Sequence, residues 1–243
     1  MRACVLFVCC VVVAFGRAEA ACVDPSTLVR STVSLTRIYD SEESRPAGGV
    51  VGIRGTGWFL SPRMLVTAAH VAEAMRLSEQ EWKTIDIKER DSKQSVHVRT
   101  LQIAGSHSEK IAVLELKEAL ADAAVLSNRE EPLVPEERLI SLAYPDNALR
   151  FAGGRFVRIG DNGRLTGLAL LEMHDGDDRL VLDHGASGAP VLDCGGKVVA
   201  VVSTLLTQTL NFPPKVLRVS TAWQTPNVAS VPIEVLKDLR RSD

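Results

Sequence analysis

The sequence is organised around a short turn in its last quarter, which reads Asp183-His184-Gly185-Ala186-Ser187-Gly188-Ala189-Pro190. Extended runs flank this turn, at 179–182 and 190–192. A serine between two glycines on a tight turn can present its hydroxyl while neighbouring backbone N–H groups converge on one point. Acyl transfer needs both an exposed nucleophile and such a set of hydrogen-bond donors. Ser187 is therefore the candidate nucleophile of the chain.

A second motif lies far upstream and ends in a histidine. It begins with Gly55-Thr56-Gly57 and closes with Thr67-Ala68-Ala69-His70. A serine hydroxyl must lose its proton to a nearby base as it attacks a carbonyl, and imidazole has a suitable pKa for this role. Each motif alone also fits a purely structural role: the serine motif could be a hairpin loop, and the histidine could be a buried side chain with its hydrogen bonds satisfied. The order of the two motifs, histidine before serine, favours a catalytic pair.

Together, these motifs resemble those of the trypsin/chymotrypsin-type serine proteases, in particular the compact bacterial and HtrA-like members. The resemblance covers nearly all of the chain after its leader. It implies an all-β fold, a double six-stranded antiparallel β-barrel (chymotrypsin-like) with a short C-terminal helix. A lipase elbow is excluded, because G-x-S-x-G needs glycine where this chain has Ala189. The run Val231-Pro232-Ile233 resembles the element that closes HtrA-like protease domains, and we expect no PDZ domain after it.

The resemblance also implies roles for individual residues. His70 would be the general base and Ser187 the nucleophile, and the backbone N–H groups of Gly185 and Ser187 would form the oxyanion hole. Glycine at position 185 leaves the backbone free to turn its N–H inward. Ser203 and Thr204 would lie on the wall of a substrate pocket that suits small or apolar side chains. The resemblance implies no cofactor, and the sequence contains no spacing typical of metal ligands.

One position departs from the family pattern. The family carries an aspartate at the start of a strand that reads D-I-A-L-L, and this aspartate orients the histidine. Here the stretch reads Glu109-Lys110-Ile111-Ala112-Val113-Leu114, so Lys110 stands at the triad-acid position. A cation cannot accept the histidine N–H and opposes the imidazolium, and losing the acid costs a serine protease on the order of 10⁴ in turnover. Asp183, or Glu109 through a β-bulge that re-aims it, are the substitutes that we leave open.

Short strand-like runs recur along the chain between turn residues, with no sustained helical period, which predicts a β-sandwich or barrel. The last of these strands is expected at 216–221. The expected organisation is a signal peptide at 1–20 and a trypsin-like peptidase domain at 21–243, divided into a first barrel at about 28–117, a charged, proline-bearing connector at 118–137, and a second barrel with the C-terminal helix at 138–243.

The N-terminus has the layout of a secretory signal. Arg2 precedes an apolar run at 5–15, and Ala18-Glu19-Ala20 fits a cleavage site. The run is shorter than the roughly 20 residues of a spanning helix, so we expect cleavage and no stable membrane anchor, with an uncleaved anchor as the alternative. Cleavage would leave Cys22 and Cys194, which we expect to form one disulfide in an oxidising compartment. Two cysteines favour a bacterial periplasmic or secreted protein, and the sequence before Cys22 lacks a lipoprotein signal.

Charge excludes several classes of partner. The chain of 243 residues has a formal net charge of −2 and a pI near 6.2. This balance provides no basic surface for nucleic acid and no polybasic patch for a membrane. We therefore expect a peptide or protein substrate, and the sequence carries no signal for an oligomeric state.

Three functional hypotheses follow from these observations. The first is an exported trypsin-like serine endopeptidase that uses His70 and Ser187. The alternative is a pseudoprotease that binds peptides or proteins in the same cleft without cutting them, because Lys110 replaces the triad acid. A third hypothesis makes the barrel a purely structural partner in an envelope assembly.

Overall fold

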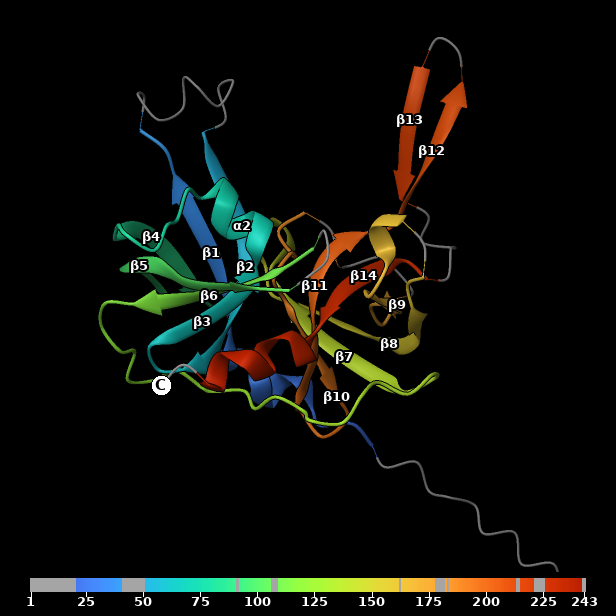
Figure 1. Ribbon diagram of the computed structural model, residues 1–243, viewed down its shortest axis with the longest axis horizontal. Coiled ribbons are helices and arrows are strands. Elements are labelled where there is room, and N and C mark those ends of the chain that lie inside the picture. Colours follow the sequence, from blue (N-terminus) through green and yellow to red (C-terminus); the bar gives the residue numbers. More distant parts are fainter. Residues whose placement is uncertain are drawn as a thin grey trace, which may run out of the picture.

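The computed structural model describes residues 21–40, 51–90, 92–105, 109–161, 163–177, 182, 184–212, 215–220 and 226–241. The expected signal peptide, residues 1–20, lies outside this set. Two closed six-stranded antiparallel barrels stand side by side (Figure 1). The predicted fold class is therefore confirmed. No helix in the described ranges is long and apolar enough to cross a membrane.

The first barrel has the strand order β1-β2-β3-β6-β5-β4. Its strands are β1 (Thr32–Ile38), β2 (Gly52–Ser61), β3 (Met64–Ala68), β4 (Lys83–Glu89), β5 (Ser92–Ala104) and β6 (Ile111–Leu116). The short helix α2 (Ala69–Ala74) follows β3 directly. Alternate residues point inward, and Val33, Leu35, Phe59 and Leu65 form part of the buried interior.

The second barrel repeats this plan with the strand order β10-β11-β14-β9-β8-β7. Its strands are β7 (Arg138–Ala143), β8 (Arg150–Ile159), β9 (Ala169–His174), β10 (Pro190–Asp193), β11 (Val198–Leu205) and β14 (Val228–Pro232). Short 3-10 helices complete the fold: η1 (Pro25–Ser31), η2 (Pro145–Asn147), η3 (Gly163–Leu165) and the C-terminal η4 (Ile233–Arg241). A separate ribbon, β12 (Thr207–Phe212) with β13 (Lys215–Ser220), projects away from the second barrel (Figure 1).

A shared hydrophobic cluster fills the space between the barrels. It combines residues from both barrels with residues from η1 and η4, and includes Val29, Trp58, Val66, Ile140, Leu192, Val201, Ile233 and Leu236. Burial of such side chains is worth about 1.5–3 kcal/mol each. The C-terminal helix therefore packs against both barrels.

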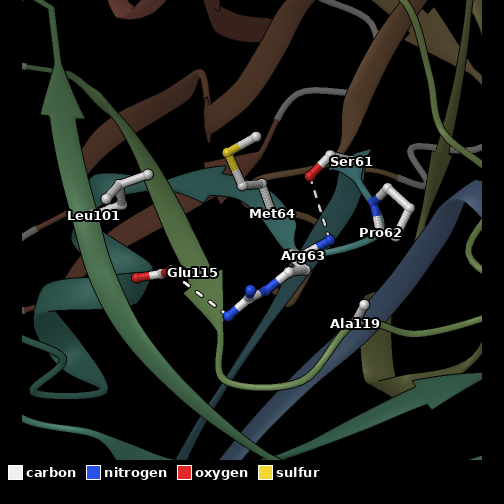
Figure 2. A pocket seen from close by; sticks show the side chains of 7 residues that line it. All are labelled: Ser61, Pro62, Arg63, Met64, Leu101, Glu115 and Ala119. Carbon is white, nitrogen blue, oxygen red and sulfur yellow. Dashed lines mark hydrogen bonds and ion pairs between the residues drawn. The ribbon is translucent and has the colours of Figure 1, made fainter. Parts of the chain in front are cut away.

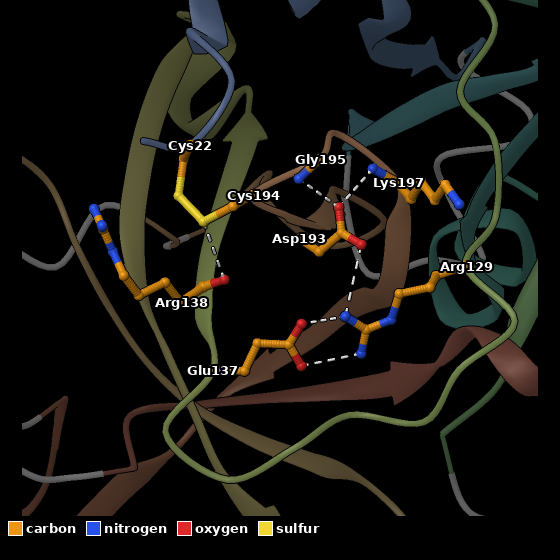
Figure 3. The surroundings of a disulfide bond; sticks show 8 residues. All are labelled: Cys22, Arg129, Glu137, Arg138, Asp193, Cys194, Gly195 and Lys197. Carbon is orange, nitrogen blue, oxygen red and sulfur yellow. Dashed lines mark hydrogen bonds and ion pairs between the residues drawn. A yellow bond between two sulfur atoms is a disulfide. The ribbon is translucent and has the colours of Figure 1, made fainter. Parts of the chain in front are cut away.

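The N-terminal segment is attached covalently to the second barrel. Cys22 and Cys194 form a disulfide across 172 residues of sequence (Figure 3). The N–H of Val23 also donates to the carbonyl of Cys194 at 2.9 Å. Cys194 lies on the turn from β10 to β11, where the Asp193 carboxylate accepts the N–H groups of Gly195 and Lys197 at 2.9 Å each. The predicted disulfide is therefore present, and it joins a turn that is already ordered by hydrogen bonds.

A buried guanidinium holds the connector beside this turn. Arg129 donates two hydrogen bonds to the Glu137 carboxylate and lies 3.6 Å from Asp193 (Figure 3). It also donates to the carbonyls of Glu131 and Pro132, each at 3.0 Å. Burial opposes ionisation of Glu137. Three effects together outweigh this burial: the hydrogen bond from Arg129, the hydrogen bond from the Val134 N–H, and the charge of Arg129. The pKa of Glu137 is therefore lowered.

We expect Glu137→Gln to destabilise the fold by about 3 kcal/mol at pH 7, because it removes one partner of a buried ion pair. The lowered pKa means that this stabilisation is fully present above the ordinary carboxyl pKa of about 4.3 and is lost as pH falls through the folded-state value. Urea unfolding at several pH values would therefore show the gap between wild type and variant closing below about pH 4. Glu136→Gln is the control, because Glu136 pairs with Arg155 at the exposed surface. An equal loss in both variants would contradict the prediction.

Candidate active site

Ser187 lies on a turn that packs directly against the first barrel. Gly188, the next residue, has φ +92°, and a Cβ there would lie 2.1 Å from the Thr56 carbonyl and 2.2 Å from Thr67 Oγ1. Gly185 also has a positive φ, +97°. Both glycines of the motif therefore provide a positive φ, and Gly188 in addition allows the turn to approach β2 and β3 closely.

All four carbonyls of the turn 184–187 accept a hydrogen bond. The donors are the N–H of Asp146 to His184 at 3.4 Å, Thr56 Oγ1 to Gly185 at 2.7 Å, the N–H of Ala189 to Ala186 at 2.9 Å, and the N–H of Thr56 to Ser187 at 2.9 Å. In a trans peptide the N–H and C=O point in opposite directions. The amides of Gly185 and Ser187 therefore point away from these partners, and neither donates to a group in the described part of the protein. Two backbone donors are thus left available on the turn that carries the serine.

His70 is the second residue of α2, at the end of β3. The N–H of Ala69 donates to the carbonyl of Lys110 at 2.8 Å, which fixes the start of α2 beside the start of β6. The His70 side chain is 46% exposed, and its Nδ1 lies 3.6 Å from the Glu109 Oε2. The histidine therefore has a carboxylate on its Nδ1 side, which leaves Nε2 for a substrate or a nucleophile.

The side chain that faces His70 belongs to Glu109, whereas Lys110 is exposed. Lys110 is the residue that matches the family's aspartate in sequence. Ladder pairing in β6 begins only at Ile111, so the alternation of a strand does not decide where Glu109 points. The structure therefore places Glu109, the neighbour of Lys110, beside His70, and β6 contains no bulge.

Ser203 connects the carboxylate to the nucleophile. It lies at an irregularity in β11, where the register with β14 shifts between Val202 and Thr204. Its buried hydroxyl donates to Glu109 Oε2, and its carbonyl accepts the Ser187 hydroxyl at 3.0 Å. Ser203 therefore touches both halves of the site, with its side chain directed to Glu109. Thr204, the other residue expected on the pocket wall, is exposed.

One continuous set of contacts thus links Ser187, Ser203, Glu109 and His70. Among the residues that the structure describes, no hydrogen bond joins His70 to Ser187 directly, because the Ser187 hydroxyl donates to Ser203. Catalytic hydrogen bonds are often long or misaligned in a free enzyme and tighten when the substrate binds. Asp183, the other substitute for the triad acid, lies outside the described residues.

Comparison with known proteins decides the family. A model described as a trypsin-like peptidase domain matches residues 55–201, which is more than half of the chain and includes His70, Glu109 and Ser187. The chain belongs to the trypsin-like peptidase family. A comparison with curated proteins finds no match.

Solved structures show the same trypsin-like fold at low identity. An inactive form of Rv3671c from M. tuberculosis H37Rv is 14% identical, with a TM-score of 0.55 over 88% of this chain and 86% of that chain. The active form of the Rv3671c protease is 15% identical, with a TM-score of 0.57 over 88% and 80%. The HtrA-type protease AlgW, solved with a tripeptide, is 14% identical, with a TM-score of 0.57 over 90% of this chain and 61% of that chain.

The protein also contains a cavity outside the candidate active site. A cavity of about 490 Å³ lies beside the β2–β3 turn of the first barrel (Figure 2). Its lining consists of Ser61, Pro62, Arg63, Met64, Leu101, Glu115 and Ala119. None of these residues belongs to the contacts between Ser187 and His70, so this cavity is separate from the candidate active site.

The sequence motifs did not single out Thr56 or Tyr144 as site residues, although both contact the nucleophile turn. Thr56 lies in the Gly55-Thr56-Gly57 sequence that begins the histidine motif, and its hydroxyl between two glycines could have identified it as a site residue. Tyr144 follows β7 with no local motif, so only the folded chain reveals its position.

We expect Gly188→Ala to destabilise the protein by about 3 kcal/mol, because the new methyl group would collide with β2 and the backbone would be strained at positive φ. Thermal and urea unfolding would measure this loss. Gly153→Ala in β8 is the matched control, since a Cβ there meets nothing within 4 Å. A variant at 188 that is as stable as the variant at 153 would contradict the tight contact between the turn and the first barrel.

Proposed function

We propose that the protein is an exported serine endopeptidase that hydrolyses peptide bonds through an acyl-enzyme. In this proposal His70 is the general base, Ser187 is the nucleophile, and the N–H groups of Gly185 and Ser187 form the oxyanion hole. Glu109 is the carboxylate that orients His70. The observation that carries the proposal is the Glu109 carboxylate on the Nδ1 side of His70, held there by the buried Ser203 hydroxyl.

The acylation step uses each of these groups. The Ser187 hydroxyl leaves its bond to the Ser203 carbonyl and attacks the substrate carbonyl, while its proton passes to Nε2 of His70. The oxygen that becomes negative is stabilised by two N–H donors that are already oriented. The tetrahedral intermediate then collapses, the C–N bond breaks, and the imidazolium gives its proton to the leaving amine. Water repeats the sequence on the acyl-enzyme and releases the acid.

Glu109 supports this cycle through the histidine. A carboxylate on the Nδ1 side favours the tautomer that leaves Nε2 unprotonated, and it stabilises the imidazolium of the transition state. The 3.6 Å separation is longer than the roughly 2.7–2.9 Å of a charge-assisted hydrogen bond, so the two groups must approach each other in the reacting complex. In this proposal Lys110 stands outside the triad, with its side chain in solvent.

Labelling with a fluorophosphonate probe tests the assignment. We expect the wild type to label at Ser187 and Ser187→Ala to remain unlabelled. Glu109→Gln should label more slowly by a factor on the order of 10³–10⁴, because an amide cannot stabilise the imidazolium. Lys110→Met is the control, and its rate should stay within about threefold of the wild-type rate. Equal rates for Glu109→Gln and wild type would remove Glu109 from the mechanism.

A pseudoprotease is the second candidate, favoured by Lys110 at the matched position and by the Ser187 hydroxyl that donates to Ser203 instead of to a base. This candidate makes a different prediction for the same probe. The wild type would stay unlabelled, because the Ser187 hydroxyl would keep its bond to the Ser203 carbonyl. Absence of labelling in every variant would reject the catalytic assignment.

Export to the periplasm or the exterior is supported by the apolar leader and by the Cys22–Cys194 disulfide. We expect the mature protein to begin at Ala21 and to be oxidised at both cysteines. Mass spectrometry of the secreted or periplasmic fraction, run without reductant, would give a mass that lacks residues 1–20 and the two thiol hydrogen atoms lost when the disulfide forms. Recovery of the full-length chain with free thiols in the cytoplasm would contradict this expectation.

A further inference from the structure

We propose that Thr56 is the positioning residue of the oxyanion hole, acting through its hydroxyl on the Gly185 peptide. The proposal rests on the proposed function and names a residue of the first barrel that the reaction would need. Thr56 lies in β2, is fully buried, and faces the nucleophile turn. It contacts neither the substrate position nor His70 through any bond in the described chain, so its effect is indirect.

Every polar group of Thr56 is used. Its N–H donates to the Ser187 carbonyl at 2.9 Å, and its carbonyl accepts Thr67 Oγ1 at 2.7 Å. Its hydroxyl donates to the Gly185 carbonyl at 2.7 Å and accepts the N–H of Tyr144 at 3.0 Å. One side chain thus connects the first barrel, the end of β7 and the turn that carries the nucleophile.

A hydroxyl makes both side-chain bonds from one atom. The Gly185 carbonyl needs a donor, whereas the Tyr144 N–H needs an acceptor, and a Ser or Thr oxygen supplies both. Valine has the same shape, but it would remove the acceptor of the buried Tyr144 N–H and the donor to the part-buried Gly185 carbonyl. The branched threonine side chain also restricts rotation about χ1, which keeps the oxygen between the two groups.

The bond to Gly185 matters because glycine imposes little direction of its own. Gly185 has φ +97° and no Cβ, so its two flanking peptide planes rotate more freely than those of other residues. The plane before it is held by the long contact from the Asp146 N–H to His184, at 3.4 Å. The plane after it is held by Thr56 at 2.7 Å. Of these contacts the one from Thr56 is the shorter, and it acts on the carbonyl side of the residue whose N–H would bind the oxyanion.

Tyr144 is fixed independently of the turn. Its phenol oxygen accepts the N–H of Arg90 at 2.9 Å, and the residue is buried. A Cβ on Gly185 would lie 2.9 Å from the Tyr144 carbonyl, so the turn packs closely against this residue. The Tyr144 N–H therefore holds the Thr56 hydroxyl in place, and the hydroxyl donates its own proton to the Gly185 carbonyl of the turn.

The test compares Thr56→Val with Thr56→Ser in the mature protein, using the fluorophosphonate as the probe. Its phosphoryl oxygen occupies the oxyanion hole as the bond to Ser187 forms. We expect Thr56→Val to lower the maximal inactivation rate by about 10²–10³, with less than about a threefold change in the half-saturating probe concentration. Thr56→Ser keeps the hydroxyl and should retain the rate within about fivefold. Loss of rate in both variants, or in neither, would overturn the proposal.

Thr100→Val controls for the removal of a buried hydroxyl as such. Thr100 lies in β5 of the same barrel, is buried, and its hydroxyl has no hydrogen-bond partner among the described residues. This variant should be as stable as the wild type in urea and should label at the wild-type rate. A rate loss in Thr100→Val equal to that in Thr56→Val would assign the effect to general loosening of the barrel and would overturn the proposal.

A readout that needs no activity separates this proposal from the proposed function. In ¹H–¹⁵N spectra, the amide signals of Gly185 and Ser187 should shift or broaden in Thr56→Val and remain near their wild-type positions in Thr56→Ser. If the wild type fails to label while this pattern holds, the proposed function fails and the positioning role stands. Unchanged Gly185 signals in Thr56→Val would reject the positioning role whatever the activity.

Discussion

The candidate site depends on the contact between the nucleophile turn and the wall of the first barrel. Gly188 allows the turn to approach β2 more closely than any side chain would permit, and Thr56 then binds two of its carbonyls. The serine and the two available amides lie on the turn before β10 of the second barrel, whereas the carboxylate lies before β6 of the first barrel. Their relative positions are therefore set by how firmly the barrels are joined, at this contact and through the hydrophobic cluster that η4 completes.

The fold could be predicted from the sequence because its signals are local and repeated. Period-two alternation and turn residues marked the strands, and the pair of motifs around His70 and Ser187 indicated which all-β architecture they form. The ribbon β12–β13 was only partly anticipated. We predicted a strand at 216–221 but none at 207–212, where Thr207-Gln208-Thr209-Leu210 alternates too weakly to distinguish a strand from a loop.

The site was harder to predict, since its supporting contacts join residues far apart in the chain. The family motif aligns its aspartate with Lys110, whereas the side chain beside His70 is that of Glu109. The alternation rule applies inside a ladder, and these two residues precede the ladder of β6. Ser203 was expected on a pocket wall, and the sequence did not indicate that its hydroxyl also contacts the carboxylate. A shift of one residue at a strand end is therefore enough to exchange a cation for an anion beside the histidine.

The projecting ribbon has a consequence for how the molecule meets other polypeptides. Closed barrels have no edge strand, so their backbone groups are saturated by neighbouring strands. In the described chain β12 and β13 pair only with each other, which leaves an open flank on either side of the ribbon. An extended chain that joins this protein by strand addition will find its backbone partners there.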